Sequence, residues 1–324
     1  MAIRKVSTSS INTGSKTSNF WDQNTLVWNN TVDFLVVAGG GSGGGNHGAG
    51  GGAGGLRSSV KATGGGGVLE NKLTVNPGTT YTITVGSGGA RYFGNINGRG
   101  NAGTNSVFHT ITSTGGGGGQ NWSSGSVTID NGGGLSNSGS TSTGISNQLY
   151  AGGSVSSSGT YAGGGGGAGG AGRQGAVDAP GTGGYGGVGL AVDITGTSVY
   201  YAGGGGAGGH SPTTFSWGPF GIGGLGGGGD GGRFYGTEAL SLSGSDGQPN
   251  TGGGGGGSGK NKLNDNSTIA NGPGFSANYS GAGGSGVVII RALKAAASTT
   301  GSPTYTTIGS YHIYQFNGDG SITF

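Results

Sequence analysis

Residues 39–55 read GGGSGGGNHGAGGGAGG and follow directly on an apolar segment, VDFLVVA, at residues 32–38. A run of glycine has no side chains to pack, and ordering each residue costs roughly 1–2 kcal/mol of backbone entropy. Such a run stays disordered unless another interaction stabilises it. The same alternation recurs along the whole chain, so it must specify the fold. Further glycine runs lie at residues 64–67, 115–119, 132–134, 163–172, 203–209, 223–232, 252–257 and 281–286.

Extended left-handed helices with three residues per turn can order glycine runs when several lie side by side. Their bare backbones approach closely enough to hydrogen-bond to one another, helped by weak Cα–H···O contacts. Only glycine permits that approach on every side, and the N–H and C=O groups of adjacent helices then satisfy each other. We therefore predict a mainly β and irregular fold. Short β-strands accompany a stacked sandwich of polyglycine-II-type extended helices, and there is no substantial α-helix.

The composition favours an ordered chain. Glycine and proline make up 91 and 7 of the 324 residues, a level typical of low-complexity sequences. However, only 8% of the residues are charged and the net charge is +3, whereas disordered chains rely on charge for solvation. Strand-like segments between the glycine runs also indicate order.

Charge and cysteine content exclude several classes of function. The 14 basic residues are scattered singly and form no stripe that would bind nucleic acid. Cysteine is absent, so rigidity must come from backbone hydrogen bonds and not from disulfides. The polar N-terminus has no apolar core of signal-peptide length, and no apolar run is long enough to span a membrane. We expect the chain to be made and folded in a cytoplasm.

Several short segments show the β-branched enrichment and partial alternation of strands. The uninterrupted apolar run from Val287 to Ile290 predicts a strand that is buried on both faces. No segment has the 3.6-residue apolar period of an amphipathic helix. The predicted strands are residues 32–38, 69–75, 80–86, 106–112, 188–196, 198–202 and 286–292, with a turn at residues 76–78.

We divide the chain into an N-terminal arm (1–31), a glycine-rich domain (32–293), and a linker with a C-terminal β-hairpin (294–324). The arm is rich in Ser, Thr and Asn, and the aromatic side chains near its end suit a segment that orders on a partner. Capping of the first strand explains the same rings equally well. The candidate docking residues are Phe20, Trp21 and Trp28. In the tail, YHIYQF-NGDG-SITF predicts the hairpin, with Asp319 and Gly320 in its turn.

A set of segments recurs in a fixed order: VDFLVVAGGGSGGG, TYTITVGSGG, NSVF, YAGGGGGAGG, its near copy YAGGGGAGG, and GGSGVVIIRA. In this order they resemble the glycine-rich module of bacteriophage tail-fibre and related virion proteins, over residues 32–293. The leader MAIRKVSTSS…GSKTSNFWD looks like those of marine phage structural proteins, cyanophage ones in particular. The free-standing arm and the appended tail depart from the pattern of such adhesins.

The resemblance implies a non-enzymatic virion structural protein that is assembled in the host bacterial cytoplasm with other tail or capsid proteins. In adhesins with a glycine-helix sandwich, it also implies recognition of a host surface glycan or outer-membrane protein through loops at one end. A tail-fibre tip, a tail-fibre shaft segment and a capsid-mounted fibre or decoration protein all remain open, as does a homo-oligomer. We expect no cofactor, no nucleic acid partner and no membrane insertion.

The sequence motifs that usually indicate catalysis or metal binding are weak here. GGGGSGKN at residues 254–261 comes within one residue of a P-loop, but Asn261 stands where Ser or Thr must hold magnesium. We place His109 on a strand, and the four histidines lack the spacing of metal ligands. There are two glutamates, Glu70 and Glu238, and no paired carboxylates within one motif that would hydrolyse a glycan. We therefore predict no catalytic, cofactor or metal site.

Aromatic side chains between the glycine runs are the candidate contact residues. A glycine run cannot accommodate a large ring, so these rings must lie in loops or over the ends of the sandwich. Rings in loops suit stacking on sugars or gripping a receptor loop, and rings that only cap the open ends are the alternative. Phe215, Trp217 and Phe220 are the strongest candidates because they cluster beside two prolines. The other candidates are Tyr235, Phe275, Tyr279 and Trp122.

Ice binding is a second class of function to consider. Arrays of glycine-rich extended helices can offer a flat, regular face. Such a face needs small side chains at a fixed spacing in every helix, whereas the loops here vary in length and the runs are irregular. A thermal-hysteresis measurement separates the two hypotheses.

Overall fold

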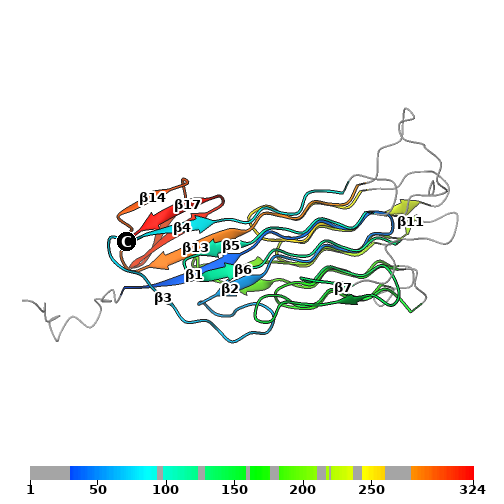
Figure 1. The fold of residues 1–324 in the computed structure, drawn as a ribbon, viewed down its shortest axis with the longest axis horizontal. Coiled ribbons are helices and arrows are strands. Elements are labelled where there is room, and N and C mark those ends of the chain that lie inside the picture. Colours follow the sequence, from blue (N-terminus) through cyan, green and yellow to red (C-terminus); the bar gives the residue numbers. More distant parts are fainter. Residues whose placement is uncertain are drawn as a thin grey trace, which may run out of the picture.

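The computed structural model describes residues 30–92, 98–122, 128–157, 161–175, 182–209, 217–218, 220–235, 243–259 and 279–324. These residues form seventeen short strands and no helix, which confirms the predicted mainly β and irregular fold. The fold is elongated, with β-sheets at one end and extended glycine segments towards the other (Figure 1). A helix capable of crossing a membrane is therefore not found in the described part of the chain.

Two mainly antiparallel sheets form the sheet half. The first sheet has the order β15-β16-β13-β1-β2, and β3 pairs with the start of β1. Its strands are β1 (Thr31–Val37), β2 (Leu56–Ser58), β3 (Leu73–Thr74), β13 (Val287–Ala292), β15 (Thr304–Ile308) and β16 (Tyr311–Phe316). The second sheet has the order β14-β17-β4-β5-β6. It consists of β4 (Thr80–Thr84), β5 (Ser106–Phe108), β6 (Ile111–Ser113), β14 (Ser298–Thr300) and β17 (Gly320–Thr323).

Three smaller ribbons complete the strands. The pair β9 and β10 is antiparallel, as the sequence predicted for residues 188–196 and 198–202. The pair β11 and β12 is also antiparallel, whereas β7 and β8 are parallel. Their bounds are β7 (Thr128–Ile129), β8 (Thr141–Ser142), β9 (Leu190–Val192), β10 (Val199–Tyr201), β11 (Trp217–Gly218) and β12 (Phe234–Tyr235).

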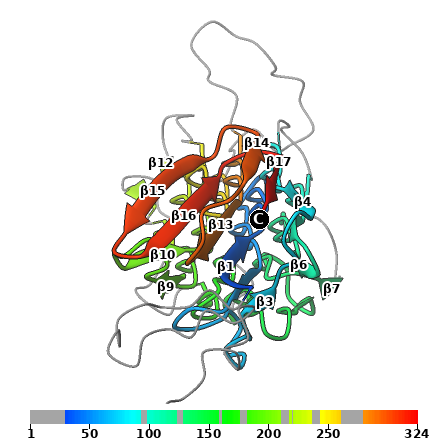
Figure 2. The ribbon, with the colours of Figure 1, turned by 90° about the vertical axis from the view of Figure 1, so that its left-hand side faces the viewer.

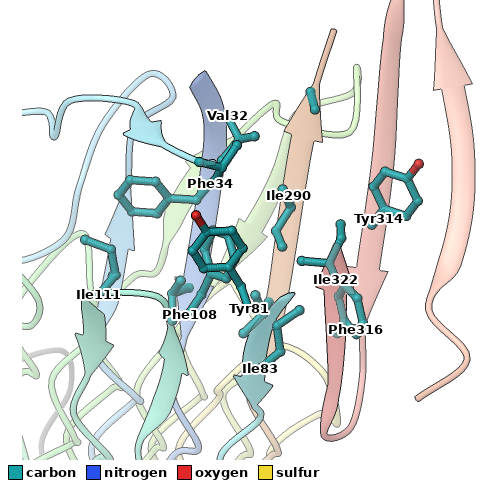
Figure 3. Packing of buried hydrophobic residues seen from close by; sticks show 14 of the residues in the cluster. Val32, Phe34, Tyr81, Ile83, Phe108, Ile111, Ile290, Tyr314, Phe316 and Ile322 are labelled. Atoms are coloured by element: carbon teal, nitrogen blue, oxygen red, sulfur yellow. The ribbon is translucent and has the colours of Figure 1, made fainter. Parts of the chain in front are cut away.

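The centre of the first sheet is buried on both faces because its central strands, β1 and β13, are almost wholly apolar. Phe34 and Val36 of β1 lie in an apolar cluster with side chains of the second sheet (Figure 3). Leu35 and Val37 lie in another cluster on the opposite face, together with side chains of β9 and β10. Since neighbouring residues of a strand point to opposite faces, both clusters are built from one apolar run. The prediction for residues 287–290 is confirmed.

Two predicted strands are shorter or differently built in the structure. The segment 106–112 forms a hairpin of β5 and β6, and His109 lies in its turn with φ of 54°. The placement of His109 on a strand was therefore wrong, because one continuous strand cannot bury both Phe108 and Ile111 as this hairpin does. Of residues 69–75, only Leu73 and Thr74 form a strand.

The C-terminal strands β16 and β17 do not pair with each other. β16 pairs with β13 and β15, and β17 pairs with β4 and β14. The predicted C-terminal hairpin is wrong, because the intervening turn carries the chain from one sheet to the other. Phe316 and Ile322 then enter the cluster between the two sheets from opposite sides. The segment that was expected to be a linker contains β14.

The glycine runs are extended segments that lie side by side in the described part of the chain (Figure 1). Their hydrogen bonds repeat every three residues. Successive N–H groups of residues 39–45 donate in rotation to carbonyl groups of residues 98–104, 281–284 and 49–52, at N···O distances of 2.8 to 3.1 Å. Three consecutive residues thus point to three different neighbours, as in a helix with three residues per turn.

Carbonyl groups of the same run accept hydrogen bonds from three further segments. These donors are residues 116–119, residues 255–258 and Gly89. The run at residues 39–45 is therefore surrounded on all sides by backbone, and its interior consists of peptide groups. All of its residues are buried. We call this assembly of hydrogen-bonded glycine segments the glycine stack.

The same rotation of partners occurs elsewhere in the glycine stack. N–H groups of residues 203–209 donate in turn to residues 226–232, 184–187 and 48–51. Those of residues 163–168 donate to three neighbours in the same way. The runs at 163–172 and 203–209 are therefore packed segments and not separate loops, as predicted.

Glycine is required inside the glycine stack for steric reasons. A Cβ atom added to Gly165 would overlap the carbonyl oxygen of Gly51, and one added to Gly205 would overlap that of Gly255. Several other residues within the runs are small and buried, namely Ser42, Ala49, Ala53, Ala168, Ala207 and Ser258.

Candidate functional site

The molecule has two distinct ends. β1 begins and the chain ends on the side of the sheets (Figure 1). The glycine run after β1 extends away from the sheets and turns back at residues 45–48. Backbone hydrogen bonds place Gly98, Trp122, Gly208 and Ser258 beside this turn, each close to a gap in the described chain. We call this region the far end.

The turn at the far end contains two residues in the left-handed region. Asn46 has φ of 44° and His47 has φ of 52°. Glycine adopts this conformation freely, whereas another residue pays on the order of 1–3 kcal/mol. Asn and His are among the non-glycine residues that adopt this conformation most readily.

Trp122 packs against this turn. The centroid of its ring lies 5.2 Å from that of His47, and its backbone N–H donates to the Asn46 carbonyl at 3.4 Å. The Trp122 carbonyl accepts from Asn137 Nδ2 at 3.3 Å. The residue is 40% exposed. One face of the indole is therefore fixed by the protein while part of the ring is open to a partner.

Buried polar atoms without partners lie next to Trp122. The Asn121 side chain is fully buried, and neither its Oδ1 nor its Nδ2 has a hydrogen-bond partner in the described part of the chain. Asn46 Oδ1 and Ser136 Oγ are also unpartnered there. Each such group costs about 1–3 kcal/mol of desolvation. Unpaired buried polar groups of this kind are rare in native proteins.

Two further aromatic candidates are held by arginines. The guanidinium of Arg91 lies 4.8 Å from the centroid of the Tyr279 ring, and that of Arg233 lies 4.6 Å from the Phe220 ring. Arg91 also forms an ion pair with Asp246, whose hydrogen bond raises the pKa of Arg91. Phe220 and Tyr279 are partly exposed. Cation–π contact therefore fixes both rings at the surface.

Two other candidates are brought opposite each other by backbone pairing. Trp217 of β11 is in register with Tyr235 of β12 in an antiparallel ribbon. This ribbon lies at the far end of the molecule (Figure 1). Backbone pairing thus brings together residues 217 and 235, which are 18 positions apart in sequence.

The remaining candidates fall outside the described residues. They are Phe215 and Phe275 among the predicted contact residues, and Phe20, Trp21 and Trp28 of the predicted docking arm.

The far end therefore offers chemistry for contact. It presents partly exposed aromatic rings and guanidinium groups, which together suit stacking and hydrogen bonding to a partner. Among the described residues, no group of three His, Cys, Asp or Glu side chains is placed to hold a metal ion.

Sequence reasoning found Trp122, Phe220 and Tyr279 but missed their partners. The signal for His47 was its position beside Asn46 as the only non-glycine pair within residues 43–48, where glycine would serve the turn best. The arginines had no such signal, because the glycine stack brings Arg91 and Tyr279 together from distant parts of the chain.

Comparisons with known proteins identify the family of the chain. A family model described as a glycine-rich domain matches residues 15–293. No curated protein and no solved structure matches the chain. The chain belongs to the glycine-rich domain family.

Proposed function

We propose that this member of the glycine-rich domain family is a non-enzymatic structural protein of a bacteriophage virion. Its role is that of a tail-fibre or adhesin component that contacts the host surface through the far end. The segments from VDFLVVAGGGSGGG to GGSGVVIIRA support this proposal by their resemblance to phage tail-fibre modules.

The observation that carries the proposal is that the two ends of the fold differ. The residues that connect to the N-terminal arm lie at the sheet end, with Thr31 the first residue of β1. Partly exposed Trp122, Phe220 and Tyr279 lie beyond the sheets along the glycine stack. An arm at one end and contact groups at the other is what a protein needs to bridge a particle and a surface.

The glycine stack is suited to act as a spacer between these two ends. Each of its inner segments is hydrogen-bonded to neighbours on several sides, which favours a rigid spacer. A rigid support lowers the entropy lost when the far end binds a partner. The proposed partner is a surface glycan or an outer-membrane protein of the host bacterium.

The outer rows of the glycine stack argue against ice binding. Residues three apart in one segment point to the same side, so Ile222 and Leu225 form one outward row beside Val188 of the next segment. These side chains are 51%, 66% and 40% exposed. They differ in size and shape, whereas an ice-binding face needs uniform small side chains. A measurable thermal hysteresis would reverse this conclusion.

Immunogold labelling of virions tests the proposal and separates its alternatives. Antibodies against the purified chain are expected to decorate the tail fibres. Label on the head would support the capsid-mounted fibre or decoration protein in its place. If purified particles carry no label and contain no peptide of this chain by mass spectrometry, the chain is not a virion protein.

A further inference from the structure

One open edge of the first sheet is strand β15, which pairs with β16 on one side and with no described strand on the other. All five of its residues are exposed, as are the three residues of β14 at the edge of the second sheet. The two strands are separated only by residues 301–303 (Figure 2). The open edges of both sheets therefore belong to one continuous stretch of chain.

β15 lacks the features with which edge strands avoid pairing with other chains. Such strands carry charged side chains, an internal proline or a bulge. Residues 297–310 contain no charged residue, and their one proline, Pro303, precedes β15. The register with β16 runs without interruption from Thr304 to Ile308, so no bulge twists the edge away. At the other edge of this sheet, by contrast, Arg57 of β2 forms an ion pair with Glu70.

The turn between β15 and β16 determines which backbone groups point outward. It consists of two residues, with Gly309 at φ of 56°. In such a hairpin the flanking residues, Ile308 and Tyr311, form a hydrogen-bonded pair. Hydrogen-bonded and non-hydrogen-bonded pairs alternate, so Thr306 also bonds to β16. The N–H and C=O groups of Tyr305 and Thr307 therefore face the open side.

We propose that a second copy of this chain pairs with β15, antiparallel and two-fold symmetric about Thr306. In this register Tyr305 of one copy lies opposite Thr307 of the other, so their outward backbone groups bond across the interface. Thr306 faces its own counterpart. Threonine–threonine and aromatic–β-branched pairs of this kind stabilise antiparallel strands.

The lack of charge on β15 favours pairing with a second copy, and the position of Pro303 favours the register centred on Thr306. A neutral strand pairs with itself without the like-charge repulsion that a lysine-bearing edge would suffer. A register centred on Tyr305 would place Pro303 opposite Thr307, and proline has no N–H to donate. A register centred on Thr307 would place Gly309 of the turn opposite Tyr305. Only the register centred on Thr306 pairs the outward N–H and C=O groups of one copy with those of the other copy while all the paired residues belong to β15.

The side chain of Tyr305 is already ordered for this contact. Its hydroxyl lies 2.7 Å from Nδ1 of His312, and its ring centroid lies 5.1 Å from that of Tyr314. Tyr305 nevertheless remains 51% exposed. A side chain that is fixed before association loses less entropy in the interface.

Sedimentation equilibrium of the full chain tests the proposal, which does not depend on host contact. The chain is expected to show a reversible monomer–dimer equilibrium. Thr307→Pro removes an N–H that points away from β16, so the monomer keeps its ladder while the interface loses a bond from each copy. Thr306→Lys places two ammonium groups opposite each other. Each variant is expected to raise the dimer dissociation constant at least about tenfold.

Thr112→Lys is the matched control, because Thr112 is an exposed threonine on β6, at the opposite edge of the second sheet. Its dimer dissociation constant should equal that of the unmodified chain. Circular dichroism shows which variants fold, and one folded β15 variant suffices for the comparison. A chain that stays monomeric at all accessible concentrations overturns the proposal. So does a folded Thr306→Lys or Thr307→Pro variant that dimerises as tightly as the unmodified chain.

Discussion

The sheet half and the glycine stack hold their interiors together by different means. In the sheet half, apolar side chains such as Phe34 and Phe316 fill the space between two sheets. In the glycine stack, peptide groups fill the interior and hydrogen-bond in rotation to their neighbours. The first interior loses stability when a side chain is removed, and the second loses it when a side chain is added. Substitutions of opposite kinds therefore distinguish the two halves.

The largest effect is expected from adding a side chain to the glycine stack. Gly165→Val should prevent folding, because its Cβ would overlap the Gly51 carbonyl on a neighbouring segment. Soluble yield and the thermal melt measure the effect. Gly318→Val is the control, since Gly318 is exposed and has no atom within 4 Å of an added Cβ. A soluble Gly165→Val variant with a normal melt would contradict the packing described above.

Removing a side chain from the sheet half should have the next largest effect. Phe34 is fully buried between the sheets, so Phe34→Ala should lower the free energy of unfolding by about 3–5 kcal/mol. Ile222→Ala in the glycine stack is the matched truncation, and it should change stability little because Ile222 is 51% exposed. Denaturant titration measures both. Equal losses would mean that burial of apolar side chains is not what stabilises the sheet half.

The sheet half also contains a buried charge. Asp33 is 2% exposed, and its Oδ2 accepts hydrogen bonds from Arg291 Nη2 at 2.9 Å and Lys72 Nζ at 3.2 Å. Asp33→Asn should lower the free energy of unfolding by about 2 kcal/mol, because two cations then lose their counter-charge. Asp130→Asn, at an exposed position, should be nearly neutral. Similar unfolding free energies for the two variants would show that the ion pair of Asp33 does not stabilise the fold.

At the far end, a truncation should affect binding more than stability. Trp122→Ala is expected to weaken adsorption of the protein to host cells about 30-fold, the loss typical of one central aromatic anchor. Its melt should change little, because the ring is 40% exposed. Tyr200→Ala, an exposed aromatic of β10 in the sheet half, is the control and should adsorb normally. A Trp122→Ala variant that melts earlier yet adsorbs normally would show that Trp122 is only a cap.

The smallest expected effect is a loss of stability at alkaline pH. Burial raises the pKa of Tyr201 and of Tyr314 in the two apolar clusters. Because the folded pKa exceeds the unfolded one, this stabilisation is present below pH about 10 and is lost as the pH rises through the folded values. Melting temperatures measured from neutral to alkaline pH should therefore fall less steeply for Tyr201→Phe. An unchanged slope would show that Tyr201 does not contribute.

Local patterns in the sequence predicted the two central strands and the packing of the glycine runs. VDFLVVA and GVVIIRA are apolar at almost every position, so their burial follows largely from composition, and Asp33 and Arg291 are the charged exceptions. The pairing of strands was harder to predict. The turn signal NGDG predicted a hairpin, yet β16 pairs with β13 and β17 pairs with β4, in different sheets.

The contacts at the far end depend on long-range packing, which the sequence does not encode locally. Tyr279 meets Arg91 only because hydrogen bonds between distant glycine segments bring residues 89 and 283 together. The three-residue period does place outward side chains, as for Ile222 and Leu225, once the helix type is known. The packing of the whole chain decides which segments become neighbours. The sequence of a single glycine run is compatible with many neighbouring segments.

Native-state hydrogen exchange of individual glycine amides tests the central claim most directly. If peptide groups form the interior of the glycine stack, the amides of Gly41, Gly51 and Gly205 exchange only by global unfolding. Their opening free energy should then equal that of Val36 in β1, and Gly318 should exchange at the rate of a free peptide. Exchange of Gly41, Gly51 and Gly205 at the same rate as Gly318, with Val36 still protected, would contradict the account.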